Sequence, residues 1–181
     1  MSGATGTASS GATGTASSGA EIIAAIEASG VEFVVALPDI VTSENVLKPL
    51  ADHPRIRLVR VCKEDEGISI CAALSYCQRR ALLLIQQTGL LDSLNALRAI
   101  AVEYHLPICL MVGLQGKEEG VPPAQSARYG VRIVEPILDV MEVRHLLIDE
   151  AADVARIEPA IQAAYQASHP VVMLIGRSPG P

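Results

Sequence analysis

The chain has 181 residues, which suits one domain whose core is large enough to fold without disulfides or a structural metal. Half of the residues are apolar but only 3% are aromatic, so leucine, isoleucine, valine and alanine must fill the core, as in many α/β sheets. The formal net charge is −6 and no long basic run occurs, which argues against nucleic acid as a partner.

The N-terminal segment has low sequence complexity, because residues 2–17 are the octapeptide SGATGTAS written twice. Such a repeat buries too little apolar surface to offset chain ordering, so residues 1–19 are expected to be a flexible tail and residues 20–181 the folded domain. The segment lacks the basic region and apolar core of a signal peptide, and no stretch approaches the roughly 20 apolar residues of a membrane span. We therefore expect a cytoplasmic protein without membrane contact.

From Glu21 onward, short apolar runs alternate with helical patterns. The apolar runs predict six buried strands, at 31–38, 56–62, 81–87, 106–113, 143–148 and 170–176. Helical patterns occupy 20–30, 43–53, 66–78, 92–104, about 123–141 and 150–168, with Pro159 kinking or interrupting the last. This alternation predicts an α/β fold: a doubly wound, mostly parallel six-stranded sheet with helices on both faces.

Several common chemistries have no motif in this chain. No GxGxxG follows the first strand and no GxxxxGK[ST] occurs, so neither dinucleotide binding nor P-loop chemistry is supported. The four histidines are scattered without metal-ligand spacing. The cysteines form no CxxC pair, which favours reduced core thiols over disulfides or zinc; they are Cys62, Cys71, Cys77 and Cys109.

In a doubly wound sheet, ligands bind at the carboxyl ends of the strands. The segments predicted at that edge are LPDIVTSEN at 37–45, CKEDEG at 62–67, QQTGLLDSLN at 86–95 and GLQGKEEGVPPAQ at 113–125. The second contains three consecutive carboxylates, which either complement the dipole of the following helix or perform chemistry. In the third, Thr88 and Gly89 are expected in a loop, with Asp92 or Ser93 as the N-cap of the next helix.

Several of these motifs, in this order, resemble one enzyme superfamily. CKEDEGISICAA, ALLLIQQTGLLDSLNAL and HLPICLMVG are similar to the pyrimidine-binding domain of thiamine-diphosphate-dependent decarboxylases. The resemblance is greatest to the α subunit of sulfopyruvate decarboxylase and the N-terminal part of phosphonopyruvate decarboxylase. It extends from about residue 21 to residue 177 and includes LPD at 37–39 and PAQ at 123–125.

The resemblance implies a role for the acidic triplet. In the superfamily a carboxylate after the second strand hydrogen-bonds the aminopyrimidine ring of the cofactor and so activates it for attack on a 2-oxo acid. Alignment in the superfamily's register places Asp65 at this catalytic position, whereas Glu66 has the longer side chain, and both remain candidates. The resemblance further implies cofactor contacts by Glu64, Gln87, Thr88, Gly89 and Asn95. It implies substrate contacts by Asp39, Lys117 and Gln125.

Two features depart from the superfamily pattern. The sulfopyruvate relatives carry a basic pair before the glycine after the fourth strand, where this chain has Leu114-Gln115-Gly116. Either Lys117 replaces the missing cation, or the substrate is a different 2-oxo acid. The diphosphate-binding motif that holds Mg²⁺ is also missing, so the resemblance implies a separate partner subunit that brings it and a hetero-oligomer. A non-catalytic scaffold or regulatory paralogue, or a flavodoxin-like binding domain, are the alternatives.

Overall fold

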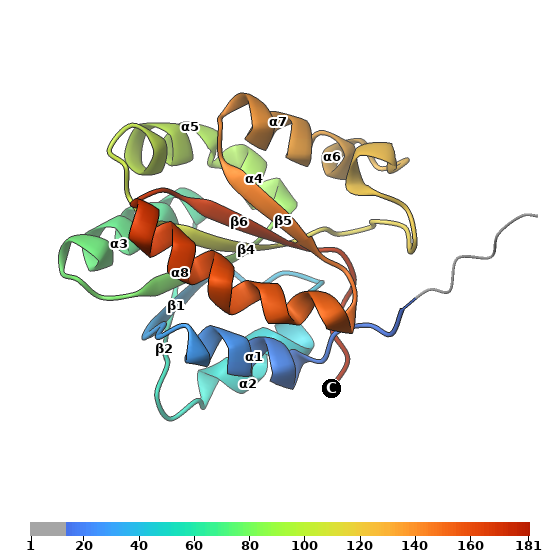
Figure 1. Cartoon of the computed structure of the whole chain (residues 1–181), viewed down its shortest axis with the longest axis horizontal. Coiled ribbons are helices and arrows are strands. Elements are labelled where there is room, and N and C mark those ends of the chain that lie inside the picture. Colours follow the sequence, from blue (N-terminus) through green and yellow to red (C-terminus); the bar gives the residue numbers. More distant parts are fainter. Residues whose placement is uncertain (1–13) are drawn as a thin grey trace, which may run out of the picture.

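The computed structural model describes residues 14–181 and contains one six-stranded sheet (Figure 1). All five strand pairs are parallel, and the strand order is β2-β1-β3-β4-β6-β5. The strands are β1 Phe33–Ala36, β2 Arg57–Arg60, β3 Ala81–Gln86, β4 Cys109–Gly113, β5 Arg144–Ile148 and β6 Val171–Ile175. Each of the six predicted runs therefore contains a strand.

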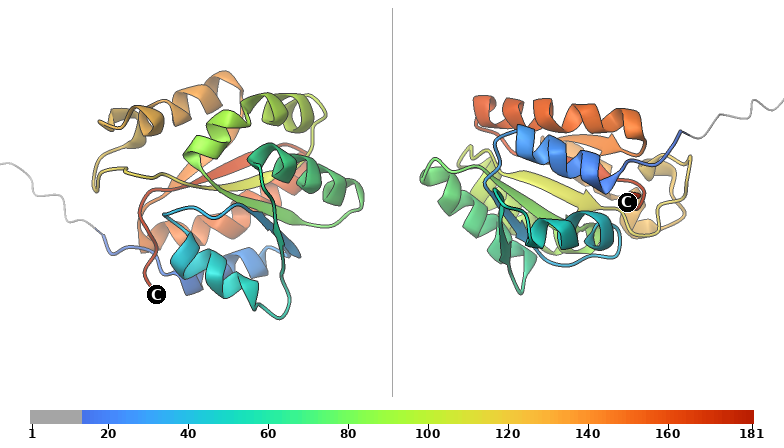
Figure 2. Two further views of the ribbon diagram at one scale, coloured as in Figure 1. Left: turned by 180° about the vertical axis from the view of Figure 1, so that it is seen from behind. Right: turned by 90° about the horizontal axis from the view of Figure 1, so that it is seen from below.

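Helices cover both faces of the sheet, which confirms the predicted doubly wound α/β fold (Figures 1 and 2). One face carries α1 Gly19–Ala28, the π-helical turn η1 Ser43–Leu47, α2 Lys48–Ala51, the 3-10 helix η4 Ala151–Arg156 and α8 Ile157–Ala167. The other carries α3 Glu64–Tyr76, α4 Gln87–Asp92, α5 Leu94–Ala96, the π-helical η2 Leu97–Val102, the 3-10 turn η3 Pro123–Gln125, α6 Tyr129–Arg132 and α7 Val134–Val140. Within residues 14–181, no helix is both long and apolar enough to cross a membrane.

Two apolar cores lie on opposite sides of the sheet because successive side chains of a strand point to opposite faces. In β3, Leu82 and Leu84 join the core beneath α1 and α8, whereas Leu83 and Ile85 join the core beneath α3 and α7. All four side chains are fully buried. A central strand that is apolar on both faces is therefore read as a continuous apolar run in the sequence.

The prediction of six buried strands is wrong for the two edges of the sheet. Strands β2 and β5 have only one neighbour each and are partly exposed. In β2, Arg57 and Arg60 face solvent. Charged side chains on an edge strand discourage pairing with another chain, which accounts for the mixed composition of this run.

The last helical segment is interrupted, but before the proline rather than at it. The 3-10 helix η4 gives way to α8 at Ile157, and Pro159 is the third residue of α8. The first turn of an α-helix leaves its N–H groups without intrahelical acceptors, so a proline there removes no hydrogen bond.

Only two of the four cysteines are core residues as predicted. Cys71 and Cys109 are buried, and burial raises the pKa of the Cys71 thiol to about 12 and that of Cys109 still further. Cys62 and Cys77 are exposed, because they lie just outside the apolar positions of β2 and α3. All four thiols are free.

Residues 14–19, which the sequence placed in the flexible tail, form hydrogen bonds with the rest of the domain (Figure 2). Gly180 N–H donates to Ser17 O over 2.8 Å, and Gly19 N–H donates to Gly180 O over 2.8 Å. Ala151 N–H donates to Thr15 O over 2.9 Å. The two ends of the described chain therefore hold each other in place, a long-range pairing that the local repeat composition does not reveal. Residues 1–13 of the expected tail lie outside the described residues.

The pairing of the chain ends makes a prediction for truncated proteins. Removing residues 1–18 eliminates the hydrogen bonds at Gly14, Thr15 and Ser17, whereas removing residues 1–13 leaves them intact. Because each such bond contributes about 1 kcal/mol, we expect the longer truncation to lower the free energy of unfolding by about 1–3 kcal/mol relative to the shorter one. Urea titrations followed by circular dichroism measure the difference. Equal midpoints for the two truncations would contradict this assignment.

Candidate functional site

The parallel sheet brings the segments after β1, β2, β3 and β4 to one edge. The chain leaves β1 towards β2 on one side and returns to β3 on the other, so strand order reverses between β1 and β3. Ligand sites of doubly wound folds lie at such a reversal, on the carboxyl side of the strands. The sequence-predicted site residues therefore lie in segments that follow the strands at this edge. Their contacts differ from residue to residue.

The acidic triplet forms the first turn of α3. Lys63 is the N-cap residue, and Glu64, Asp65 and Glu66 follow as the first three helical residues. Negative charge is favourable there because the first N–H groups and the helix dipole present partial positive charge. The dipole accounts for acidic residues at this place in general, but the three side chains have different neighbours.

Glu66 and Asp65 are bound at the start of the helix in different ways. The Glu66 carboxylate accepts a hydrogen bond from Cys62 N–H over 3.2 Å and so closes the chain back on itself. Asp65 Oδ1 accepts from Glu66 N–H over 2.9 Å, while Asp65 Oδ2 lies 3.6 Å from Lys63 Nζ. The Asp65 side chain is 41% exposed, so it is open to a ligand from the solvent side.

Glu64 packs over a glycine of the neighbouring helix. A Cβ atom built on Gly89 would lie 2.1 Å from Glu64 Oε1, a separation that no real side chain tolerates. A side chain at this position would require the Glu64 side chain to move. Glu64 and Gly89, both predicted cofactor contacts, are therefore neighbours.

The segment after β3 is helical where a loop was predicted. Helix α4 begins at Gln87, directly after the strand, and contains Thr88 and Gly89. Ser93 does not cap the next helix with its side chain; its hydroxyl donates to Gly89 O over 2.7 Å instead. Thr-Gly and Asp-Ser pairs are typical of turns, but the close contact of Gly89 with α3 outweighs that local preference.

Two glutamines link the ends of β3 and β4. The buried Gln87 carboxamide accepts from Gln115 N–H over 2.8 Å and donates to Gln115 O over 3.2 Å. Gln86 Nε2 donates to Thr88 Oγ1 over 2.9 Å and to Gln115 Oε1 over 2.8 Å. Both glutamines thus fix the turn after β4 relative to α4, and Thr88 stays exposed.

Lys63, which the sequence did not single out, and Asp92, which was expected only as a possible helix N-cap, also belong to this cluster. Lys63 Nζ lies 3.1 Å from Asp92 Oδ2 and 3.6 Å from Asp65 Oδ2, so it joins the start of α3 to the end of α4. The hydrogen bond with Asp92, followed by the charge of Asp65, raises the pKa of Lys63. Asn95, a predicted cofactor contact, is exposed on α5 and accepts hydrogen bonds from Arg98 at 2.9 and 3.3 Å.

Asp39 shapes its own loop after β1. Its carboxylate accepts hydrogen bonds from Val41 N–H over 2.6 Å, from Thr42 N–H over 2.8 Å and from the Thr42 hydroxyl. It is 5% exposed and lies against Gly113 at the end of β4. This geometry favours a structural role, and substrate contact by Asp39 stays a prediction.

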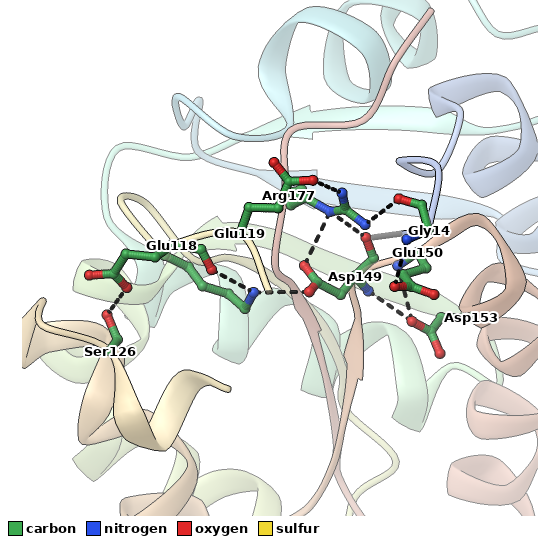
Figure 3. A network of polar contacts seen from close by, with 9 residues as sticks. Gly14, Glu118, Glu119, Ser126, Asp149, Glu150, Asp153 and Arg177 are labelled. Atoms are coloured by element: carbon green, nitrogen blue, oxygen red, sulfur yellow. Dashed lines mark hydrogen bonds and ion pairs between the residues drawn. The ribbon is translucent and has the colours of Figure 1, made fainter. Parts of the chain in front are cut away.

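Lys117 is not the free cation that the sequence suggested. Its side chain is 0% exposed, and its ammonium lies 2.9 Å from Asp149 Oδ2 and donates to Glu118 O over 3.2 Å. Arg177 reaches the same aspartate, donating from Nε to Asp149 O over 2.8 Å, and pairs with Glu119 over 2.7 Å (Figure 3). A buried cation paired with a carboxylate is poorly placed to bind a substrate anion, so this geometry favours a structural role, and substrate contact by Lys117 stays a prediction.

Two cavities border the turn after β4. The first, of about 390 Å³, is lined by Gln87, Gln115, Gly116, Arg128, Tyr129, Gly130 and Val131. The second, of about 250 Å³, is lined by Ile40, Val41, Leu114, Gln115, Gly116, Lys117, Glu119, Gly176, Arg177 and Ser178. Gln125, exposed at the end of η3, lines neither cavity. Residues 14–181 contain no group of three His, Cys, Asp or Glu side chains placed to bind a metal ion.

Comparison with known proteins gives relatives of one kind. No protein-family model matches the chain. The sulfopyruvate decarboxylase subunit alpha of Methanothermobacter thermautotrophicus is 31% identical over 122 residues, which are 67% of this chain and 72% of the relative. The same subunit of Methanococcus maripaludis is 35% identical over 92 residues, which are 51% of this chain and 54%, about half, of the relative.

A solved structure has the same fold. The 2-oxoglutarate:ferredoxin oxidoreductase from Magnetococcus marinus, with 2-oxoglutarate, coenzyme A and succinyl-CoA bound, superposes with a TM-score of 0.63. The superposition covers 87% of this chain and 28% of the oxidoreductase chain at 16% sequence identity, so it supports the fold alone.

Together, the doubly wound sheet and the polar clusters at its carboxyl edge define an α/β domain of the kind that binds ligands at that edge. The identity and coverage of the Methanothermobacter relative then define the family. The chain belongs to the family of sulfopyruvate decarboxylase α subunits.

The contact between Glu64 and Gly89 makes a stability prediction. In Gly89→Ala the new methyl group collides with the Glu64 carboxylate, so we expect a loss of about 1–3 kcal/mol in the free energy of unfolding. Adding Glu64→Ala should recover part of this loss, as a double-mutant cycle by urea denaturation measures. Gly130→Ala is the control, because no atom lies within 4 Å of its added Cβ. Equal losses for the two glycine variants would contradict the contact.

The buried ion pair makes a second stability prediction. Lys117→Met leaves the Asp149 carboxylate buried with one cation fewer, so we expect a loss of about 3–5 kcal/mol in the free energy of unfolding. Lys48→Met is the matched control, since Lys48 pairs with Glu44 at the surface, with side chains 66% and 73% exposed. That change should alter stability by less than about 1 kcal/mol. A Lys117→Met protein as stable as the control would contradict the buried pair.

Proposed function

We propose that this chain is the pyrimidine-binding subunit of a split, thiamine-diphosphate-dependent 2-oxo acid decarboxylase. The observation that carries the proposal is its membership of a family whose relatives are named sulfopyruvate decarboxylase subunit alpha. The acidic turn of α3 at the ligand-binding edge supports it. In this proposal residues 20–181 form the pyrimidine-binding domain, a separate subunit holds the diphosphate and Mg²⁺, and a small 2-oxo acid is the substrate of the resulting hetero-oligomer.

The donor set at the carboxyl edge fits the pyrimidine half of the cofactor. An aminopyrimidine ring offers nitrogen atoms that pair with a carboxylate, and the first turn of α3 supplies carboxylates at a solvent-accessible position. When bound, thiamine diphosphate supplies the carbon nucleophile and accepts the electrons released with carbon dioxide. The task of this chain is to hold a proton at one ring nitrogen and to orient the ring.

The contacts of the triplet suit different parts of that task. Within residues 14–181, Asp65 Oδ2 is paired with Lys63 alone, so this oxygen can accept or share a proton from a ring nitrogen. Glu66 would have to release Cys62 N–H in order to do so. Glu64, against Gly89, lies where it can contact the ring from the α4 side. Asp65 and Glu66 stay joint candidates for the activating carboxylate.

An alternative function is a non-catalytic scaffold or regulatory paralogue of the same domain. The aspartate at position 65 favours it, because the side chain is shorter than a glutamate by one carbon–carbon bond, about 1.5 Å. A displacement of that size at a reacting group costs on the order of a hundredfold in rate. In the scaffold alternative the acidic turn serves the helix dipole alone.

The activating carboxylate is tested in the complex reconstituted with its diphosphate-binding subunit. If Asp65 is the activator, Asp65→Asn should keep assembly but slow exchange of the thiazolium C2 proton by about a hundredfold or more, because an amide cannot share the proton. Asp65→Glu should retain or raise the exchange rate, and Glu66→Gln should change it little. The reverse pattern would assign the task to Glu66.

The control is Asp52→Asn, an exposed acid after α2 on the opposite face of the sheet. Proton exchange followed by NMR, together with carbon dioxide release, separates cofactor activation from later steps. If none of the triplet variants differs from Asp52→Asn while the complex still forms, the scaffold alternative holds.

A further inference from the structure

The first cavity beside the turn after β4 contains one charged side chain. Among its seven lining residues, Arg128 is the only cation and no carboxylate is present. The remaining lining side chains are two carboxamides, a tyrosine and a valine, together with two glycines. A cavity of about 390 Å³ lies within the usual range for small-molecule sites. Its electrostatic character therefore favours a small anion.

The backbone at Arg128 is firmly held. Ser126 is fully buried, and its hydroxyl donates to Glu118 Oε2 over 2.6 Å. Ser126 Oγ in turn accepts from Arg128 N–H over 3.0 Å. Ala127 N–H donates to the other oxygen of Glu118 over 3.1 Å. These bonds, with the Ser126 hydrogen bond first, and the nearby charge of Arg128 hold the pKa of Glu118 below its usual value. The carboxylate is thus occupied by backbone and hydroxyl donors.

The side chain of Arg128 packs against Gly116. A Cβ atom on Gly116 would lie 3.4 Å from Arg128 Cγ and 3.4 Å from its Nε. Gly116 has a φ of +80°, which glycine adopts without strain, so the turn exposes its bare backbone to the arginine. Gly130, on the cavity wall, has no atom within 4 Å of an added Cβ, which leaves the cavity open there.

The guanidinium of Arg128 has no partner of its own within residues 14–181. Neither a hydrogen bond nor an ion pair engages it, in contrast to Arg132, which donates to Ser126 O over 2.9 Å, and to Arg177 in its network with Asp149. A guanidinium presents several N–H donors in a planar fork that matches carboxylate, sulfonate and phosphonate oxygens. Arg128 is therefore an exposed cation whose backbone is fixed and whose donors are free, at the edge where the 2-oxo acid is expected.

We propose that Arg128 is the specificity-determining residue of the substrate site, and that it binds a second anionic group carried by the 2-oxo acid in the cavity beside Gly116. The inference rests on the proposed function and adds the residue that selects dianionic over monoanionic substrates. Gln87 and Gln115 form the adjoining wall, and their mutual hydrogen bonds keep that wall rigid. The cavity adjoins α4 through Gln87, and α4 in turn touches the acidic turn at Gly89.

Anion binding to the full-length chain is the first test, and it does not depend on catalysis. Sulfoacetate is the probe because it carries a carboxylate and a sulfonate but no reactive carbonyl group, and acetate is the monoanionic comparison. NMR titration should give an apparent Kd for sulfoacetate that rises about tenfold or more in Arg128→Gln, since hydrogen bonds to a charged partner are lost. Arg128→Lys should give an intermediate value, because charge remains without the fork.

The matched control is Arg144→Gln, which removes the same charge from an exposed position on β5 that does not line the cavity. It should leave the Kd for sulfoacetate within about twofold of the wild-type value. A Kd that is equal in Arg128→Gln and the wild type would overturn the proposal. So would an equal rise in the Arg144→Gln control, since that would indicate non-specific charge attraction.

Kinetics of the reconstituted complex form the second test and separate the two proposals. Arg128→Gln should raise the KM for sulfopyruvate about tenfold or more while leaving the KM for pyruvate unchanged. Equal effects on both substrates would overturn the role of Arg128 in selectivity and leave the decarboxylase function standing. Arg128-dependent binding of sulfoacetate in a complex that decarboxylates no 2-oxo acid would support the anion site and overturn the proposed function.

Discussion

Parallel pairing of all six strands is the constraint on which the rest of this structure depends. Parallel neighbours require each connection to cross back over the sheet, which places helices on both faces and every strand's carboxyl end on one edge. The polar residues of four separate segments therefore meet there. Gln86 and its partner Gln115, for example, are 29 positions apart in the sequence. The close approach of α3 to α4 at Gly89 and the glutamine contacts between the ends of β3 and β4 are consequences of that arrangement.

The sequence predicted the features that depend on local residue patterns and missed those that depend on contacts between distant parts of the chain. The central strands were predictable because a strand buried on both faces leaves an uninterrupted apolar run, as in β3. The exposure of β2 was missed because strand order, which makes it an edge, is a tertiary property. The helix beginning at Gln87 was missed because the pairs Thr-Gly and Asp-Ser favour a turn locally, whereas the contact of Gly89 with Glu64 comes from another helix. The binding of residues 14–19 was missed for the same reason, since their partners lie at the opposite end of the chain.

The candidate site was predictable to the level of the edge and not of the single residue. A run of three carboxylates looks uniform in a sequence, yet the helix gives each member a different direction, about 100° apart. One faces Gly89, one remains partly exposed beside Lys63, and one closes the helix start at Cys62. The dipole explanation and the catalytic explanation are therefore not exclusive, because the turn contains more carboxylates than either task needs. A helix start that is stabilised by one member can present another to a ligand without losing its cap.

The cations at this edge can likewise be divided into those that stabilise the fold and those that can bind a ligand. Its position in the sequence, directly after the turn that follows β4, favoured Lys117 as the cation that binds the substrate. In the structure its buried ammonium pairs with Asp149 instead. A charge that stabilises the fold in this way cannot also be exchanged with a ligand, because separating the pair would leave a desolvated carboxylate behind. Arg128 is held in the reverse manner: its backbone is fixed by Ser126 and Glu118, while its guanidinium remains without a partner in the described chain. Because only the backbone N–H of Arg128 is hydrogen-bonded, its guanidinium donors stay available, and a ligand anion can bind them without breaking an ion pair of the described residues.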